Sequence, residues 1–128
     1  MKKRLKEHGI GIAIKRNKKR LFIELTMLGK LKHEDYQIFV PMIDSALKET
    51  QGLEVDLLID MRGFRGWEFL AGWDDLKFGI KHGNDFDKMA IVGNKKWEEL
   101  SVKMMRHIMK GKSKFFKERE KALSWLLK

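Results

Sequence analysis

Apolar residues alternate with polar or small residues in two stretches near the N-terminus. In residues 9–15, three isoleucines occupy every second position, and in residues 21–27 apolar side chains again recur with a period of two. This period is typical of β-strands. The basic run of residues 15–20 between them predicts a turn, so we expect the two strands to form a hairpin.

The next stretch has apolar residues three and four apart, which predicts a helix from His33 to about residue 51. Glu34 and Asp35 lie in its first turn, where carboxylates suit the positive end of the helix dipole. Pro41 lies inside the pattern. Because the apolar spacing resumes beyond it, we expect a kink rather than an end.

Residues 54–97 predict a βαβ unit with the next helix begun, and such a unit requires a parallel sheet. The elements expected here are a strand over 55–59, a glycine-rich turn over 61–66, a helix over 67–82 and a strand over 89–92. A helix then opens at Asn94 and ends at Gly111, with Met104, Met105 and Met109 as core packing. A strand at 114–116 and a helix at 118–128 complete the order ββαβαβαβα.

The length of the chain predicts one domain, and the order of its elements predicts the α/β class. The chain has 128 residues, of which 43% are hydrophobic, and no linker divides it. It contains no cysteine, which excludes disulfides and thiolate metal ligands. No apolar run approaches the ~20 residues of a membrane span, and the first 20 residues lack a signal-peptide cleavage site. We therefore expect a cytoplasmic protein.

The formal net charge of +10 is concentrated at the two ends of the chain. Residues 1–20 carry nine Lys or Arg and one Glu, and residues 103–128 carry nine Lys or Arg and two Glu, whereas residues 21–102 are net acidic. Residues 1–8 read as a basic arm. Anionic lipid could use these ends, but solubilising charge is the preferred interpretation. Nucleic acid is disfavoured because most of the aromatic residues lie in the acidic middle.

Several segments resemble the SpoIIAA-like family of small bacterial proteins. They are Gly29-Lys30-Leu31 with Glu34-Asp35-Tyr36, Trp67 with residues 73–79 (WDDLKFG), and residues 92–99 (VGNKKWEE). The resemblance extends from about Gly9 to Leu127. That family shares its fold with STAS domains, the anti-sigma-factor antagonists. The resemblance implies a mixed sheet of four or five strands flanked by four helices.

The chain departs from the STAS pattern at the switch residue. STAS antagonists are phosphorylated on a hydroxyl residue in the turn after the third strand, which here corresponds to residues 60–67. No Ser, Thr or Tyr lies between Thr50 and Ser101. The resemblance therefore implies a module without that phospho-switch. Asp60 could accept phosphate as an acyl phosphate, but a lone Asp at a strand end is more typical of a turn or cap.

Catalytic and metal-binding patterns are missing from the sequence. The histidines His8, His33, His82 and His107 have no metal-ligand spacing. His82 and Asp85 form a local pair, and the preferred explanation is a histidine at the C-terminus of a helix, where it faces the negative end of the helix dipole. Asp74 and Asp75 point about 100° apart on a helix and cannot share one proton, so we expect them to fix the helix surface or bind a partner's basic group. The sequence predicts no enzyme, no metal and no cofactor.

Gly93 is followed by Asn94, Lys95 and Lys96, at the end of a strand and the start of a helix. Free amide groups and two ammonium groups would converge there, so these residues are the candidate anion site. A helix cap with two solvated lysines is the preferred alternative.

Trp67, Phe69, Trp73 and Phe78 spread over more than half the circumference of the predicted helix. The helix is therefore buried on several sides or presents an exposed patch. Our primary hypothesis is a non-enzymatic interaction module that binds a protein partner or a second copy. The candidate contact residues are Arg62, Phe64, Arg65 and Trp67, with Trp73 and Asp74 behind them. The alternative is a membrane-surface or apolar-ligand (lipid) binding protein, peripheral at the membrane.

Overall fold

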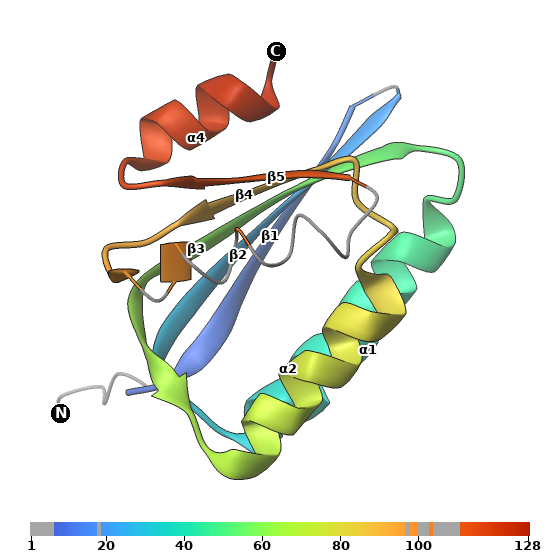
Figure 1. Cartoon of the computed structure of the whole chain (residues 1–128). Coiled ribbons are helices and arrows are strands. Elements are labelled where there is room, and N and C mark those ends of the chain that lie inside the picture. The colour runs from blue at the N-terminus through green and yellow to red at the C-terminus, as the bar shows by residue number, and fades with distance from the viewer. Residues whose placement is uncertain (1–6, 18, 97, 100–102, 104–110) are drawn as a thin grey trace, which may run out of the picture.

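The computed structural model describes residues 7–17, 19–96, 98–99, 103 and 111–128 (Figure 1). The strands are β1 (Gly9–Arg16), β2 (Arg20–Leu31), β3 (Glu54–Trp67), β4 (Lys88–Val92) and β5 (Lys112–Phe116). The helices are α1 (His33–Glu49), α2 (Phe69–His82) and α4 (Arg119–Leu126). The described residues thus give bounds for three helices where four are predicted. The predicted helix from Asn94, with Met104, Met105, Met109 and His107, lies mostly outside them.

The five strands form one mixed sheet in the order β1-β2-β3-β4-β5. β1 pairs antiparallel with β2, and Ile12 lies opposite Leu25, so the predicted hairpin is confirmed. All other neighbouring strands run parallel. The mixed sheet that the family resemblance implies is therefore present.

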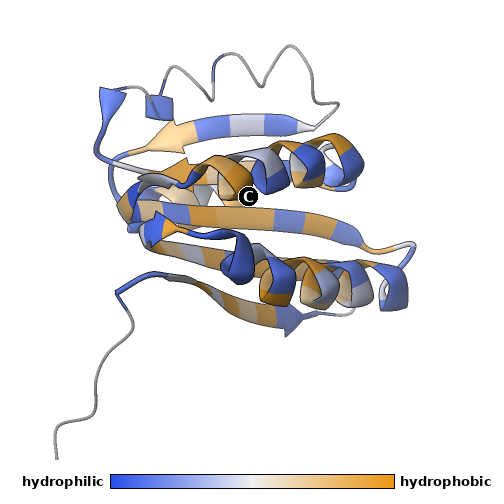
Figure 2. Ribbon diagram, turned by 90° about the horizontal axis from the view of Figure 1, so that it is seen from below, coloured by the Kyte–Doolittle hydropathy of each residue, from blue (hydrophilic) through white to orange (hydrophobic). Residues whose placement is uncertain are grey.

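The sheet has an apolar core on each face because its central strands are buried on both sides. Successive side chains of a strand point to opposite faces. Leu57 thus packs in the core beneath α1 and α2, and Leu58 packs beneath α4 with Ala90 and Leu126. Burial on both sides explains why β3 and β4 read as nearly continuous apolar runs. In Figure 2, apolar and polar residues alternate along the helices that cover these faces.

The predicted turn at residues 61–66 is wrong, because β3 continues through this segment to Trp67. β2 likewise continues to Leu31, and the two extensions pair with each other at Gly29 and Phe64. The pairing has register shifts near Gly29, whose φ is +68°. A Cβ at Gly29 would lie 2.0 Å from the carbonyl oxygen of Glu7. Gly29 therefore marks an irregularity in the strand and a close approach of two backbone segments, and not a turn.

Helix α2 begins at Phe69, two residues later than predicted. It lies against α1, and polar side chains join the two helices toward both ends. At one end, Nδ1 of His33 on α1 lies 2.5 Å from Asp74 on α2. At the other end, Nε2 of His82 on α2 lies 2.5 Å from Asp44 on α1. The two helices therefore form one layer over the sheet.

Candidate functional site

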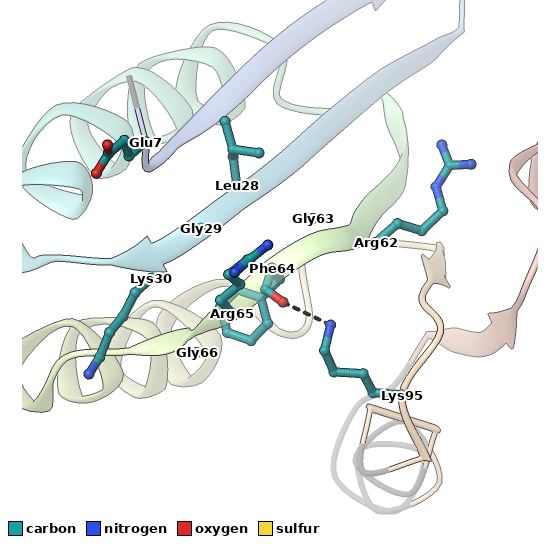
Figure 3. A pocket seen from close by; sticks show the side chains of 10 residues that line it. All are labelled: Glu7, Leu28, Gly29, Lys30, Arg62, Gly63, Phe64, Arg65, Gly66 and Lys95. Carbon is teal, nitrogen blue, oxygen red and sulfur yellow. Dashed lines mark hydrogen bonds between the residues drawn. The ribbon is translucent and has the colours of Figure 1, made fainter. Parts of the chain in front are cut away.

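An open basic groove of about 1030 Å³ lies where the extended ends of β2 and β3 meet the segment after β4 (Figure 3). Its cationic side chains are Lys30, Arg62, Arg65 and Lys95. This is the carboxyl end of the parallel strands, where ligands of open α/β sheets commonly bind. The groove brings two predicted partner residues, Arg62 and Arg65, next to Lys95 of the predicted anion site.

Several polar groups of this groove are already engaged within the chain. The Lys95 ammonium donates to the carbonyl of Phe64 at 2.8 Å, as the dashed line in Figure 3 marks. Arg62 donates to Asp60 through its backbone and its guanidinium. Burial alone would raise the pKa of Asp60, but the hydrogen bonds from Arg62 lower it below its usual range. Asp60 thus acts as a structural carboxylate.

The amides on which the predicted anion site depends are occupied. The backbone N–H groups of Asn94 and Lys95 both donate to Oε1 of Glu98 at 3.2 Å. An incoming anion would have to displace this carboxylate. Lys96 is exposed and does not line the groove.

The aromatic residues of the predicted partner site are separated by the fold. Phe64 is fully buried, so its ring is not available to a partner. Trp67 is half-buried, and its indole N–H donates to the hydroxyl of Tyr36 at 2.8 Å. Trp73 is exposed on α2, whereas Asp74 contacts His33. The corner at residues 60–67 therefore offers arginines rather than the predicted aromatic surface.

A second hollow, which we call the apolar cavity, has a volume of about 320 Å³ and lies between α2 and the sheet. This volume is in the lower part of the range of about 300–1,000 Å³ found for small-molecule sites. Its walls come from β2, α1, β3, α2 and β4, and are almost entirely aliphatic, aromatic or methionine side chains. Leu57, Ile59, Met89 and Ile91 form the sheet side, and Leu76, Gly79 and Ile80 form the α2 side.

Two carboxyl groups line this apolar cavity, Asp75 and Glu98. Asp75 accepts a hydrogen bond from the hydroxyl of Tyr36 at 2.8 Å. Burial raises the pKa of Asp75, an effect that the Tyr36 hydrogen bond only partly offsets. Burial together with the charge of Asp75 raises the pKa of Tyr36 as well. The two adjacent carboxylates Asp74 and Asp75 thus have different partners, in keeping with the predicted divergence of their side chains.

Sequence reasoning missed Glu98 and Lys30 as site residues. Glu98 follows the predicted N-cap residue Asn94 by four positions, and a carboxylate in a first helical turn is a signal for such capping. Lys30 lies in a segment that reads as a break after β2, so its place in the groove follows only from the longer strand.

Several apolar side chains of α1 and α2 are exposed, and we call them the α1–α2 face. Phe69 is 89% exposed and Ile80 is 76% exposed. The other members are Ile38, Met42, Leu70, Trp73 and Leu76. Leu76 and Ile80 also line the apolar cavity, so the face reaches the rim of that cavity. Helix α2 is thus apolar on both sides: Ala71 packs inward, and the ring of Phe78 contacts Phe39 in the core. The sequence left open whether α2 is buried on several sides or presents an exposed patch. In the structure α2 does both.

The described histidines form pairs with carboxylates. His8 contacts Asp35 at 2.8 Å, and Nδ1 of His82 contacts Asp85 at 2.7 Å. In the described part of the chain, no three His, Asp or Glu side chains gather in a group that could hold a metal ion. Among the same residues, no helix combines the length and the apolar run needed to cross a membrane.

Comparison with known proteins decides the family. A family model described as SpoIIAA-like matches residues 22–127. The chain belongs to the SpoIIAA-like family. The resemblance of its sequence segments is thereby confirmed.

Solved structures of two other proteins are similar to this SpoIIAA-like chain. One is an uncharacterised protein from Shewanella loihica PV-4, described as a member of the DUF3478 family with a SpoIIAA-like fold. It is 37% identical, with a TM-score of 0.82 and 98% of each chain covered. The other is an anti-sigma factor antagonist from Mycobacterium paratuberculosis, 10% identical with a TM-score of 0.47, over 94% of this chain and 96% of that one. No curated protein matches the chain.

Proposed function

We propose that this SpoIIAA-like protein is a non-enzymatic module that binds an apolar small molecule in the cavity between α2 and the sheet. The observation that carries the proposal is the cavity itself, because its described walls are almost entirely apolar. Apolar concave sites with a few polar groups are the usual form of small-molecule sites. The basic groove is a weaker candidate for a ligand site, because the side chains of Lys95 and Arg62 already form hydrogen bonds within the chain.

Uptake of the neutral fluorophore N-phenylnaphthylamine tests this proposal. We expect its fluorescence to rise on mixing with the protein, because the dye becomes bright in apolar surroundings. Native mass spectrometry of freshly purified protein should detect the dye bound to the chain, together with any ligand retained from the host. The proposal fails if the protein neither brightens the dye nor carries any small molecule.

A substitution at Gly79 provides the site-specific variant. Gly79 lines the apolar cavity, and a Cβ there would meet no heavy atom within 4 Å. Gly79→Leu should therefore obstruct the cavity and weaken dye binding about tenfold, while the higher helix propensity of Leu supports α2. Lys77→Leu adds the same side chain to the same helix outside the cavity lining, and should bind the dye as the wild type does.

We propose a second function for the α1–α2 face, association with an anionic membrane surface. Its exposed apolar side chains suit shallow insertion at the lipid interface. The net charge of +10, with the basic groove beside the residues that precede α2, would attract anionic lipid. The interaction with a protein partner or second copy, predicted for the 60–67 corner, would instead use this face, since Phe64 is buried.

Flotation with vesicles distinguishes binding of the α1–α2 face to a membrane from its binding to a second copy of the chain. We expect the protein to float with phosphatidylglycerol-containing vesicles at low salt and much less with phosphatidylcholine alone. The double variant Phe69→Ser, Trp73→Ser should lose flotation, whereas Leu127→Ser, which removes an exposed apolar residue outside the face, should keep it. If the wild type stays in solution as a dimer that the double variant dissociates, the face binds a second copy instead.

A further inference from the structure

The buried carboxylate of Glu98 has one oxygen that no group of the described chain binds. Glu98 is 1% exposed, although it lines the apolar cavity. Its Oε1 accepts the amides of Asn94 and Lys95. Its Oε2 is buried and has no hydrogen-bond partner among the described residues. Gly93 permits this placement, since a Cβ at that position would lie 2.4 Å from Oε1.

Such an arrangement is energetically unfavourable unless a donor completes it. A buried polar atom without a partner costs about 1–3 kcal/mol, and more if the group is charged. Natural proteins satisfy nearly all such groups. Because no described residue of the surrounding walls supplies this donor, we look for it in a molecule that enters the cavity or in water.

The remaining polar side chains of the described lining already have hydrogen-bond partners. Both ring nitrogens of His82 contact carboxylates, those of Asp44 and Asp85. The indole N–H of Trp67 donates to Tyr36, and the Tyr36 hydroxyl donates to Asp75. Among the described lining residues, the group left without a partner is therefore the acceptor oxygen Oε2 of Glu98, whereas Asp75 is already engaged by Tyr36.

We propose that the cavity selects an apolar ligand whose headgroup donates hydrogen bonds, an alcohol or a protonated amine, and that Glu98 binds this headgroup. A fatty-acid carboxylate is the disfavoured ligand, because its oxygens would meet the acceptor oxygen of Glu98 instead of a donor. This inference rests on the proposed apolar-ligand function and names the chemical class of that ligand. The headgroup lies at Glu98, and the hydrocarbon part lies between α2 and the sheet.

Competition against bound N-phenylnaphthylamine tests the inference with decylamine, decanol and decanoate, which share one hydrocarbon chain. We expect decylamine and decanol to displace the dye at concentrations about tenfold lower than decanoate. The net charge of +10 would by itself favour decanoate and oppose decylamine. A preference for the amine therefore cannot arise from long-range attraction.

Glu98→Gln isolates the role of the free oxygen. The variant keeps a carbonyl oxygen for the amides of Asn94 and Lys95 and replaces Oε2 with a donor. We expect decylamine to bind about tenfold more weakly than to wild type and decanoate to bind more tightly, whereas Glu99→Gln should change neither. The thermal midpoint of Glu98→Gln verifies that it folds.

The outcomes distinguish the inference from the function on which it rests. If the dye binds but decanoate displaces it as well as decylamine does, the headgroup inference is wrong and the apolar-ligand function stands. The same holds if Glu98→Gln retains the wild-type order of affinities. If neither the dye nor any of the three compounds binds, the proposed function itself fails.

Discussion

Two different kinds of partner hold the carboxyl groups of Asp56, Asp60 and Asp75. Asp56 receives three hydrogen bonds from the guanidinium of Arg20, at 2.7–3.1 Å, which in turn raise the pKa of Arg20. Asp60 has a similar partner in Arg62. Asp75 has only the neutral hydroxyl of Tyr36. The hydrogen bonds from Arg62 lower the pKa of Asp60, whereas burial raises the pKa of Asp75, so these two carboxyl groups respond to pH in opposite directions.

The variant Asp75→Asn tests this at the level of one residue. The folded-state pKa of Asp75 is raised above its unfolded value of about 3.9. Its contribution to stability is therefore intact below about pH 4 and is lost as the pH rises through the folded pKa. Asn keeps an acceptor for Tyr36 without the charge. At pH 7 we expect Asp75→Asn to be more stable than wild type, by about 1.4 kcal/mol per unit of raised pKa.

Urea unfolding between pH 4 and pH 8 measures the effect. The difference between Asp75→Asn and wild type should grow with pH and then level off. Asp74→Asn, which loses the contact with His33, should show no such gain. A difference between Asp75→Asn and wild type that is constant across this range would contradict the role assigned to the Asp75 charge. Asp60 behaves oppositely, because its lowered pKa gives stability that is lost in acid.

Helix α4 alone, among the described helices, covers the second face of the sheet. Its inward residues Ala122 and Leu126 are fully buried against Leu58 and Ala90. Its first residue, Arg119, donates to Glu24 on β2, which fixes the start of the helix on the sheet. The core on this face is small, so each apolar contact is a large fraction of it.

We therefore expect truncation of the Leu126 side chain to destabilise the protein strongly, although α4 lies near the end of the chain. We expect Leu126→Ala to lower the free energy of unfolding by about 2–5 kcal/mol, because it removes a buried side chain and leaves a cavity. Its neighbour Leu127 is 79% exposed, so Leu127→Ala should change stability by no more than about 0.5 kcal/mol. Urea denaturation of both variants makes the comparison, and equal effects would mean that α4 is not packed as described.

At the scale of the whole molecule, most of the fold could be predicted from the sequence. The period of two in β1 and β2 and the apolar spacing of α1 each reflect a single buried face, which a local pattern reports well. The extensions of β2 and β3 were missed because Gly29, Gly63 and Gly66 are also typical of turns. Here the strands continue through bulges, and only their mutual pairing shows it.

The candidate site could be predicted only in part. Local reading identifies Arg62, Arg65 and Lys95 as separate cationic residues, and the fold gathers them in one groove. It gives no sign of the apolar cavity, because that space depends on how far α2 lies from β3 and β4. It also misplaces Phe64, because an aromatic ring in a glycine-rich segment is expected to be exposed. In the structure, β3 continues through this segment and Phe64 is fully buried.

The paired extensions of β2 and β3 reach farther than the rest of the sheet. Beyond Leu28 β2 has no partner in β1, and beyond Asp60 β3 has none in β4. The chain enters α1 and α2 directly from the tips of this two-stranded ribbon, at His33 and Phe69. Each strand of the ribbon thus pairs on one side only, although Leu31 and Phe64 fix it to the core through fully buried side chains. Because both helices begin at its tips, a bend of the ribbon would move α1 and α2 together and change the width of the apolar cavity beneath α2.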